Sequence, residues 1–233
     1  MDKRIAVITG ASSGIGKHLS IILSEKFHIF LIARNNKKLQ KIADLITSRK
    51  NSCTIIKADI SKLNDIKIIE DKLKDFSIDI LINNAGFGIF NKILDISIDE
   101  WKNHMNTNLT GAFLMSKIVL KNMIIKKEGK IVFINSVAGK KAYPFSSAYV
   151  SSKFGLTGFA SSLREELRQD NIKVISIHPG SIDTPFWDNI NVDFPKDQML
   201  CSENVAQTIV KAILAPNNLV CEELVIRRTA GDF

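Results

Sequence analysis

The strongest constraint on the fold is a regular alternation of short, almost wholly apolar runs with longer amphipathic segments. A strand that is apolar at nearly every position is typical of a sheet covered on both faces. The predicted strands are 4–9, 28–33, 53–57, 79–83, 130–135, 173–178 and 222–227. The predicted helices are 14–26, 36–49, 62–75, 98–127, 147–170 and 203–214. This order predicts an α/β fold with a doubly wound parallel sheet of seven strands and helices on both faces.

The chain shows no linker, internal repeat or low-complexity tract that would separate domains. We therefore expect one Rossmann-like domain spanning residues 1–233. Local start signals support the helices, among them the capping-box pattern Ser97-x-x-Glu100.

The composition of the chain argues against membrane, nucleic-acid and metal partners. No stretch reaches the ~18 uninterrupted apolar residues of a membrane span, and the first residues, MDKR, lead into a strand without the features of a signal peptide. The net charge of +8 comes from single and paired lysines without interleaved aromatic residues, which predicts solvated helix faces rather than a nucleic-acid surface. We interpret the three cysteines, Cys53, Cys201 and Cys221, as packing residues. We expect a cytoplasmic protein with no metal, membrane or nucleic-acid partner.

A glycine-rich loop, TGASSGIG, follows the first strand and opens directly into a helix. Gly10 permits a tight turn, Gly14 lets the backbone approach a pyrophosphate at the helix N-terminus, and Gly16 allows close packing of helix on strand. The spacing differs from the commoner G-x-G-x-x-G. Its place between the first strand and the first helix nevertheless favours dinucleotide binding over a purely structural turn.

Other candidate residues follow the carboxyl ends of later strands, the edge at which ligands bind in open α/β sheets. The NNAG turn begins at Asn83, and a turn without any ligand would share its features. Asp59 either accepts a hydrogen bond from an adenine or caps the next segment, and capping is the simpler interpretation. Ser136 ends the fifth strand region.

Tyr149 precedes Lys153 by four residues on a predicted helix, so both side chains share one face. An ammonium about 4 Å away, at an effective dielectric constant of about 20, favours the phenolate by about 4 kcal/mol. It would bring the pKa of the tyrosine from about 10 toward neutrality, where general acids and bases work best. An isolated Y-x-x-x-K pattern would instead indicate a packed tyrosine beside a surface lysine.

The order TGASSGIG, NNAG, a strand ending in Ser136, SAYVSSK and HPGSIDTPF closely resembles the short-chain dehydrogenase/reductase family, in its single-domain branch. The resemblance covers nearly the whole chain. It implies four catalytic residues. Tyr149 would be the acid/base, and Lys153 would lower the pKa of that tyrosine and hold the nicotinamide ribose. Ser136 would orient the substrate oxygen, and Asn108, in NTNLTG, would support a water between the lysine and solvent.

The resemblance also implies a cofactor site along the same edge, with contacts to adenine and its ribose, to the pyrophosphate and to the nicotinamide carboxamide. The implied residues are Gly10, Ser12, Ser13, Gly14, Ile15, Gly16, Arg34, Asp59, Ile60, Asn83, Ala85, Gly86, Tyr149, Lys153, Pro179, Gly180, Ile182 and Thr184.

The end of the second strand predicts the choice of cofactor. Enzymes that prefer NAD usually carry an acidic side chain there for the ribose 2′-hydroxyl, whereas this chain has Ala33 and Arg34. Arg34 offers planar, charged donors to a 2′-phosphate, and the alternative is an ordinary surface arginine. Many NADP-dependent relatives also have a basic residue in the glycine-rich loop, where this chain has Ser13, and Asn35 and Lys38 are candidates to compensate. We expect NADP(H), with NAD less favoured.

Together these features predict an oxidoreductase that interconverts a ketone or aldehyde and an alcohol by hydride transfer. Residues 181–202 lack periodicity and carry Phe186, Trp187 and Phe194. This predicts a partly apolar pocket closed by the segment, and the alternatives are an ordinary loop or a small extra helix. Two other functions stay open: a 3-oxoacyl-[acyl-carrier-protein] reductase, and a dinucleotide-binding sensor or scaffold. Relatives pair through helices that correspond to 98–127 and 147–170, so we expect a homodimer or homotetramer.

Overall fold

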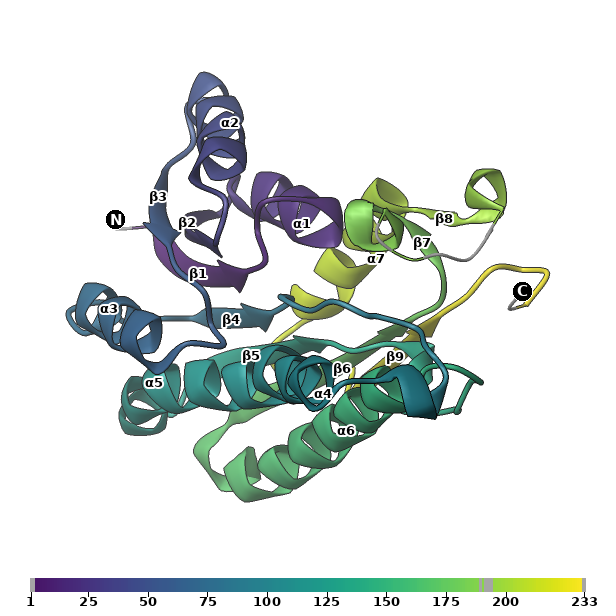
Figure 1. Cartoon of the computed structure of the whole chain (residues 1–233). Helices are drawn as coiled ribbons and strands as arrows, with labels where there is room; N and C mark the ends of the chain where they lie inside the picture. Colours follow the sequence, from purple (N-terminus) through teal and green to yellow (C-terminus); the bar gives the residue numbers. More distant parts are fainter. Residues whose placement is uncertain (1–2, 189, 191–194, 232–233) are drawn as a thin grey trace.

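The computed structural model describes residues 3–188, 190 and 195–231. Its main sheet has seven parallel strands in the order β3-β2-β1-β4-β5-β6-β9, with helices on both faces (Figure 1). These strands are β1 (Arg4–Thr9), β2 (Phe27–Ala33), β3 (Cys53–Lys57), β4 (Ile80–Asn83), β5 (Gly129–Ile134), β6 (Ile172–Pro179) and β9 (Glu223–Ile226). The α-helices are α1 (Gly14–Leu23), α2 (Asn36–Ser48), α3 (Leu63–Leu73), α4 (Ile98–His104), α5 (Gly111–Lys126), α6 (Ser147–Leu167) and α7 (Ser202–Ile213). The predicted doubly wound sheet is confirmed.

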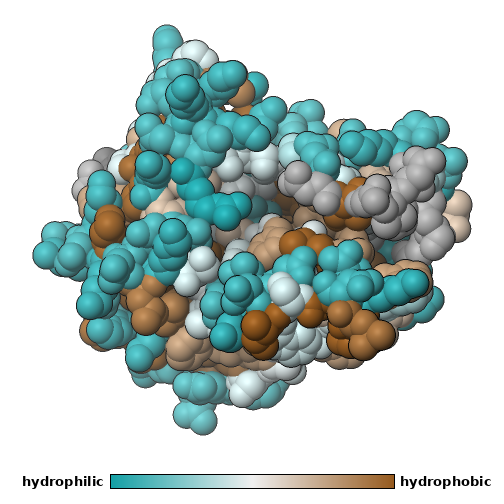
Figure 2. All heavy atoms as spheres, viewed as in Figure 1, coloured by the Kyte–Doolittle hydropathy of each residue, from teal (hydrophilic) through white to brown (hydrophobic). Residues whose placement is uncertain are grey.

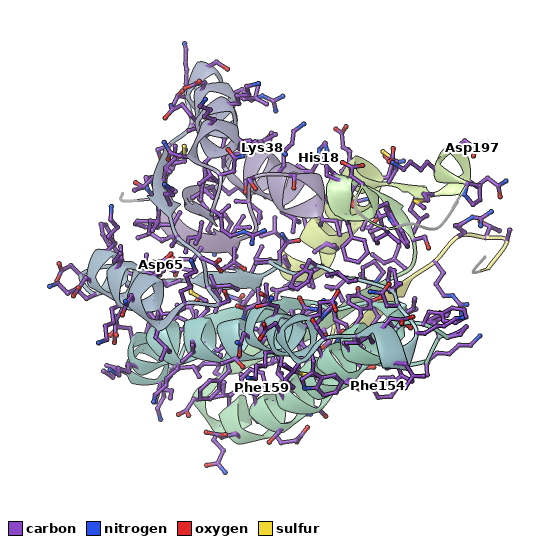
Figure 3. All side chains as sticks on the ribbon, in the orientation of Figure 1. His18, Lys38, Asp65, Phe154, Phe159 and Asp197 are labelled. Carbon is purple, nitrogen blue, oxygen red and sulfur yellow. The ribbon has the colours of Figure 1, made fainter. Side chains whose placement is uncertain are left out.

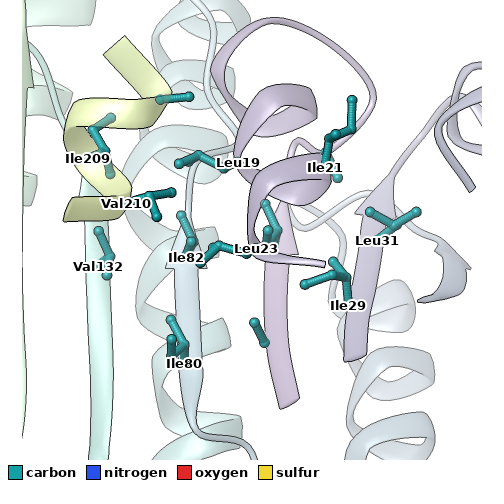
Figure 4. Packing of buried hydrophobic residues seen from close by; sticks show 14 of the residues in the cluster. Leu19, Ile21, Leu23, Ile29, Leu31, Ile80, Ile82, Val132, Ile209 and Val210 are labelled. Carbon is teal, nitrogen blue, oxygen red and sulfur yellow. The ribbon is translucent and has the colours of Figure 1, made fainter. Parts of the chain in front are cut away.

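Successive strand residues enter two separate cores. Ile8 and Ile82 face the core formed with α1, α2 and α7, whereas Val7 and Leu81 face the core formed with α3, α5 and α6. Figure 4 shows α1 and α7 beside each other on the first face, with Leu19 between them and the strands. Burial on both faces is the reason that the strand segments are continuously apolar.

Residues 98–127, predicted as one helix, form three consecutive helical segments. The capping box at the start of α4 is confirmed: Ser97 Oγ accepts from the backbone N–H of Glu100, and the Glu100 carboxylate accepts from that of Ser97. A π-helical turn, Met105–Thr110, then separates α4 from α5. Such a turn changes the direction of the side chains that follow it and is frequent at functional sites. Asn108 lies within it.

The segment after β6 contains two short strands that its sequence did not predict. β7 (Ile182–Asp183) and β8 (Leu200–Cys201) pair as a separate two-stranded parallel sheet. A 3₁₀ turn, Pro185–Trp187, follows β7 directly. Strands of two residues have no periodicity, and so no sequence pattern indicates them.

The strand order reverses between β1 and β4, because β2 and β3 lie on one side of β1 and the later strands lie on the other. Ligands of open α/β sheets bind at the carboxyl edge of this switch point. The glycine-rich loop after β1 and the NNAG turn after β4 meet there, and α4, β7 and β8 lie beyond the strand ends (Figure 1).

Three further findings concern the described part of the chain. None of its helices is both long enough and apolar enough to cross a membrane. It also contains no group of His, Cys, Asp and Glu side chains that could hold a metal ion. Cys53 and Cys221 are half-buried, but Cys201 is exposed. The interpretation of Cys201 as a packing residue was therefore wrong.

Candidate active site

The glycine-rich loop lies directly against the turn after β4. Gly10 and Gly14 have φ angles of +64° and +52°, in the left-handed region that favours glycine. A Cβ atom on Gly10 would lie 2.8 Å from the Cα of Ala85, and one on Gly16 would overlap the side chain of Asn84. Gly10 and Gly16 therefore allow the loop to pack closely against the turn after β4.

Thr9 and Asn84 hold this loop and turn together. Asn84 Nδ2 donates to the backbone oxygens of Thr9 and Gly10 at 3.0 and 3.1 Å. Thr9 Oγ1 accepts from the backbone N–H groups of Asn84 and Ala85 at 3.0 and 3.1 Å. Neither Thr9 nor Asn84 was among the predicted site residues. Asn84 is visible in the NNAG motif, but the motif does not show where its side chain points.

The first helix starts at the loop. Ser13 occupies the N-cap position of α1 and makes no capping bond through its side chain. Ser12 and Ile15 are half-buried on either side of it. The first backbone N–H groups of α1 therefore face the same edge as the loop, where a helix N-terminus favours an anion.

Arg34 and Asp59 lie together after β2 and β3. The Arg34 side chain is 76% exposed, and its Nη1 lies 4.0 Å from Asp59 Oδ2. The other carboxylate oxygen of Asp59 accepts from the backbone and side chain of Ser61 at 3.0 and 2.7 Å. Asp59 therefore caps the turn that leads toward α3, which agrees with the simpler of its two interpretations.

Two residues predicted to contact the adenosine are buried. Asn83 is 4% exposed and its side chain donates to Ser116 Oγ in α5, away from the loop. Ile60 is also 4% exposed and packs in the core beneath α5. Both side chains are thus almost fully covered by the protein.

The segment from Pro179 to Thr184 faces the glycine-rich loop from the opposite side. A Cβ atom on Gly14 would lie 3.0 Å from Thr184 Cγ2. The backbone N–H of Gly180 donates to the Ile226 oxygen at 2.8 Å, which fixes the end of β6 against β9. The oxygen of Ile182 accepts from Trp187 Nε1 at 2.8 Å. The loop and this segment together border the predicted dinucleotide site.

Tyr149 and Lys153 lie one turn apart on α6, and both are buried. Lys153 Nζ lies 5.7 Å from the centroid of the Tyr149 ring and donates to the Ile134 oxygen at 3.1 Å. A side-chain hydrogen bond joins Ser136, after β5, to Tyr149. The predicted serine, tyrosine and lysine are thus brought together from two elements of the fold.

Burial governs the protonation of this pair. It raises the pKa of Tyr149 to about 12, an effect that the hydrogen bond with Ser136 opposes. It lowers the pKa of Lys153 to about 8. The expectation that Lys153 brings the pKa of Tyr149 toward neutrality was wrong for this structure. The loss of water around the phenolate raises this pKa more than the hydrogen bond with Ser136 lowers it.

Asn108 joins the turn after β4 to α6. Its Oδ1 accepts from the backbone N–H of Phe87 at 3.0 Å, and its Nδ2 donates to the Phe87 oxygen at 2.9 Å and to Ser152 Oγ at 3.0 Å. A Cβ atom on Gly86 would lie 3.1 Å from Asn108 Oδ1 and 3.7 Å from Lys153 Nζ. Asn108 and Lys153 therefore lie beside the NNAG turn, with Tyr149 next to Lys153 and Ser136 next to Tyr149.

Aromatic side chains from two segments contact Tyr149. The ring centroids of Phe90 and Phe186 lie 5.6 and 5.7 Å from that of Tyr149. The Trp187 ring lies 6.3 Å from Phe90 and 5.3 Å from Phe186. Phe186 and Trp187 were expected in an apolar pocket, Phe90 was not, and Phe194 lies outside the described residues. In Figure 2 the surface is hollowed between the α1 side and the α4–α6 side, and apolar residues line this hollow.

Comparisons with known proteins agree with this geometry. The chain matches the family model of short chain dehydrogenases over residues 4–194. It is 33% identical to a sepiapterin reductase of Chlorobaculum tepidum over 99% of this chain and 98% of that protein. It is 32% identical to an NADP-dependent 3-hydroxy acid dehydrogenase of Schizosaccharomyces pombe over 97% of this chain and 93% of that protein.

A solved structure of a metagenomic short-chain oxidoreductase in complex with NADP is also similar. It has a TM-score of 0.85 and 27% sequence identity, with 98% of each chain covered. The family match covers most of the sequence, and the fold and the placement of the motifs agree with it. The chain belongs to the short-chain dehydrogenase family.

Proposed function

We propose that this chain is an NADP(H)-dependent oxidoreductase that interconverts a ketone or aldehyde and the corresponding alcohol, with residues 1–233 as one domain. The observation that carries the proposal is the proximity of four side chains near the turn that follows β4: Ser136 to Tyr149, Tyr149 to Lys153, and Lys153 and Asn108 to Gly86. A sensor or scaffold would have no need of this combination. The named relatives, a reductase and an NADP-dependent dehydrogenase, support the same reading.

The residues at the carboxyl edge fit a phosphorylated dinucleotide. Left-handed glycines and the N-terminus of α1 direct backbone N–H groups toward a pyrophosphate. The exposed guanidinium of Arg34 provides a planar set of donors for a 2′-phosphate. Asp59 neutralises only part of this charge, because an exposed ion pair at 4.0 Å is weak.

In the proposed mechanism, Ser136 and Tyr149 bind and polarise the substrate oxygen. The bound nicotinamide supplies or accepts the hydride. With its pKa at about 12, Tyr149 is protonated at neutral pH and acts as the acid in reduction. Giving up that proton leaves a phenolate, which the charged Lys153 stabilises. In oxidation Tyr149 must start as this phenolate, and it then takes the proton from the alcohol and becomes the phenol.

We further propose a small-molecule carbonyl or alcohol substrate, a cytoplasmic location and a homodimeric or homotetrameric assembly. The aromatic rings around Tyr149 favour a substrate with an apolar group beside the reacting carbon.

The test is a panel of ketones and aldehydes assayed for NADPH oxidation with the unmodified protein and with Tyr149→Phe. The variant removes only the hydroxyl, so we expect NADPH binding within about twofold of normal and turnover lower by about 10²-fold or more. Near-normal turnover in Tyr149→Phe would exclude the proposed acid/base. Cofactor binding without turnover on any carbonyl would favour a dinucleotide sensor.

A further inference from the structure

Segment 87–90 connects the NNAG turn to the aromatic residues over Tyr149. It forms no regular secondary structure, and two side chains of the α4–π-turn region hold its backbone. Asn108 bonds both the N–H and the oxygen of Phe87. The backbone N–H of Ile89 donates to His104 Nε2 at 3.0 Å. Asn108 belongs to the proposed catalytic set, whereas the proposed mechanism does not use His104.

His104 is held in one tautomer. Because the Ile89 N–H is a donor, Nε2 must carry the lone pair, and the hydrogen of the neutral ring is then on Nδ1. Nδ1 donates to the Glu100 oxygen at 2.7 Å, one turn earlier on α4. The side chain is 1% exposed, its ring centroid lies 4.6 Å from that of Phe87, and burial lowers its pKa. Near neutral pH the ring is therefore a neutral, fixed acceptor.

The residue after Ile89 forms part of the wall over the reactive phenol. Phe90 meets the Tyr149 ring edge to face, with an interplanar angle of 81°, and also contacts Phe186 and Trp187. Gly88 leaves room for this packing, because a Cβ atom there would lie 2.7 Å from Phe186 and 3.3 Å from Phe90. The position of Phe90 therefore depends on the backbone of segment 87–90.

We propose that His104 is a positioning residue of the substrate site. By accepting a hydrogen bond from the Ile89 N–H, it holds Phe90 against Tyr149. The site then selects carbonyl compounds with an aromatic ring beside the reacting carbon. Aromatic pairs in edge-to-face or offset geometry are more favourable than their buried area alone predicts. A ring-bearing substrate gains these contacts only while Phe90 is held in place. The inference rests on the proposed function and extends it to a substrate class.

Two substitutions separate the hydrogen bonds of His104. In His104→Gln the side-chain oxygen can occupy the place of Nε2 and still accept from Ile89. In His104→Asn the shorter amide can still donate to the Glu100 oxygen but cannot reach Ile89. We measure kcat and KM for an aromatic aldehyde and for a short aliphatic aldehyde, both chosen from the carbonyl panel.

We expect His104→Asn to raise the KM for the aromatic aldehyde about tenfold, the change expected when about one aromatic contact is lost. The KM for the aliphatic aldehyde and the affinity for NADPH should change by less than about twofold. His104→Gln should restore the aromatic KM to within about threefold of normal. Equal effects of the two variants, or equal losses for both aldehydes, would overturn the proposal.

A second measurement does not need activity. Amide hydrogen exchange at Ile89 should be at least about tenfold faster in His104→Asn than in the unmodified protein, and close to normal in His104→Gln. Exchange that is unchanged in His104→Asn would show that the bond does not hold the segment. Because this readout involves no substrate, it separates a failure of this inference from a failure of the proposed reaction.

Phe90→Leu tests whether His104 acts through the aromatic ring. If it does, adding His104→Asn to Phe90→Leu should change the aromatic KM by less than about twofold, because the contact is already gone. A full tenfold change in the double variant would overturn that route. Thermal unfolding of each variant checks that all of them fold.

Discussion

At the scale of the residue, burial rather than pairing determines how the central groups titrate. Tyr149 and Lys153 share a helix face as their spacing predicts, yet both pKa values shift toward the neutral forms. The phenol is therefore a stable acid, and the ammonium is close to losing its proton. Arg34, in contrast, is exposed and keeps its charge available for a ligand.

Lys153→Met should become less stable relative to the unmodified protein as the pH rises. The pKa of Lys153 falls from 10.5 to about 8 on burial, so its destabilising effect is complete below pH 8 and absent above about pH 10.5. Between pH 7 and pH 10 the unmodified protein should gain about 2–3 kcal/mol of unfolding free energy relative to the variant. Urea unfolding at both pH values measures this change, and a difference that does not depend on pH would contradict the assigned pKa.

Arg34→Ala should weaken NADPH much more than NADH. Loss of a charge-assisted contact to the 2′-phosphate should raise the KM for NADPH about tenfold or more, with less than a twofold change for NADH. The loss should shrink at high salt, because the contact is exposed. Arg34→Lys is the matched control, since it keeps the charge without the planar donors. Equal losses for the two cofactors would show that Arg34 does not bind the phosphate.

At the scale of the element, the site depends on how strand ends are joined to one another. β1 and β4 are neighbours in the sheet, and the turns that follow them share the hydrogen bonds of Thr9 and Asn84. The π-helical turn between α4 and α5 places Asn108 against Phe87. These contacts connect the proposed cofactor side of the site to the proposed catalytic side.

Thr9→Val should destabilise this junction. The substitution keeps the shape of the side chain but leaves the backbone N–H groups of Asn84 and Ala85 without their acceptor. We expect the unfolding free energy to fall by about 1–3 kcal/mol, together with weaker NADPH binding measured by fluorescence. Thr9→Ser retains the hydroxyl and should stay closer to normal in both measurements. Equal behaviour of the two variants would refute the role given to this hydroxyl.

At the scale of the whole molecule, an apolar face lies on the outer side of α5 and α6. Phe113 and Phe154 are each 45% exposed, and Phe159 packs against Phe113 at 5.8 Å. Figure 3 shows Phe154 and Phe159 along α6. A Cβ atom on Gly158 would meet open space, so this side of α6 leaves room for a neighbouring chain. These features support the expected pairing of copies through these helices.

Phe154→Glu should therefore reduce the oligomeric mass. At micromolar concentration we expect light scattering to give a dimer or tetramer for the unmodified protein and a smaller species for the variant, because a carboxylate would be buried without a partner. Leu63→Glu is the control, since Leu63 is an exposed apolar residue on α3. A monomeric unmodified protein would contradict the assembly, and dissociation by both variants would contradict this choice of face.

Local sequence patterns were sufficient to predict the order of the main-sheet strands, most of the helices between them and the location of the loops that border the site. These features follow from local properties: continuous apolar runs for doubly covered strands, and glycines where a backbone must turn or approach a ligand closely. Gly10 and Gly14 have the left-handed conformations that only such residues adopt readily, and Ser97 begins α4 as its pattern predicts. Spacing on one helix likewise placed Tyr149 and Lys153 on one face.

The contacts and protonation states that depend on distant segments could be read only from the folded structure. No local pattern shows the contacts of Thr9, Asn84, Phe90 and His104, because their partners follow from the packing of elements far apart in the chain. The pKa of Tyr149 was predicted to be lowered, but it is raised. Spacing along a helix shows that a charge is near, but it does not show the loss of water around the phenol. Desolvation is a property of the folded core, which forms only when all the elements have assembled.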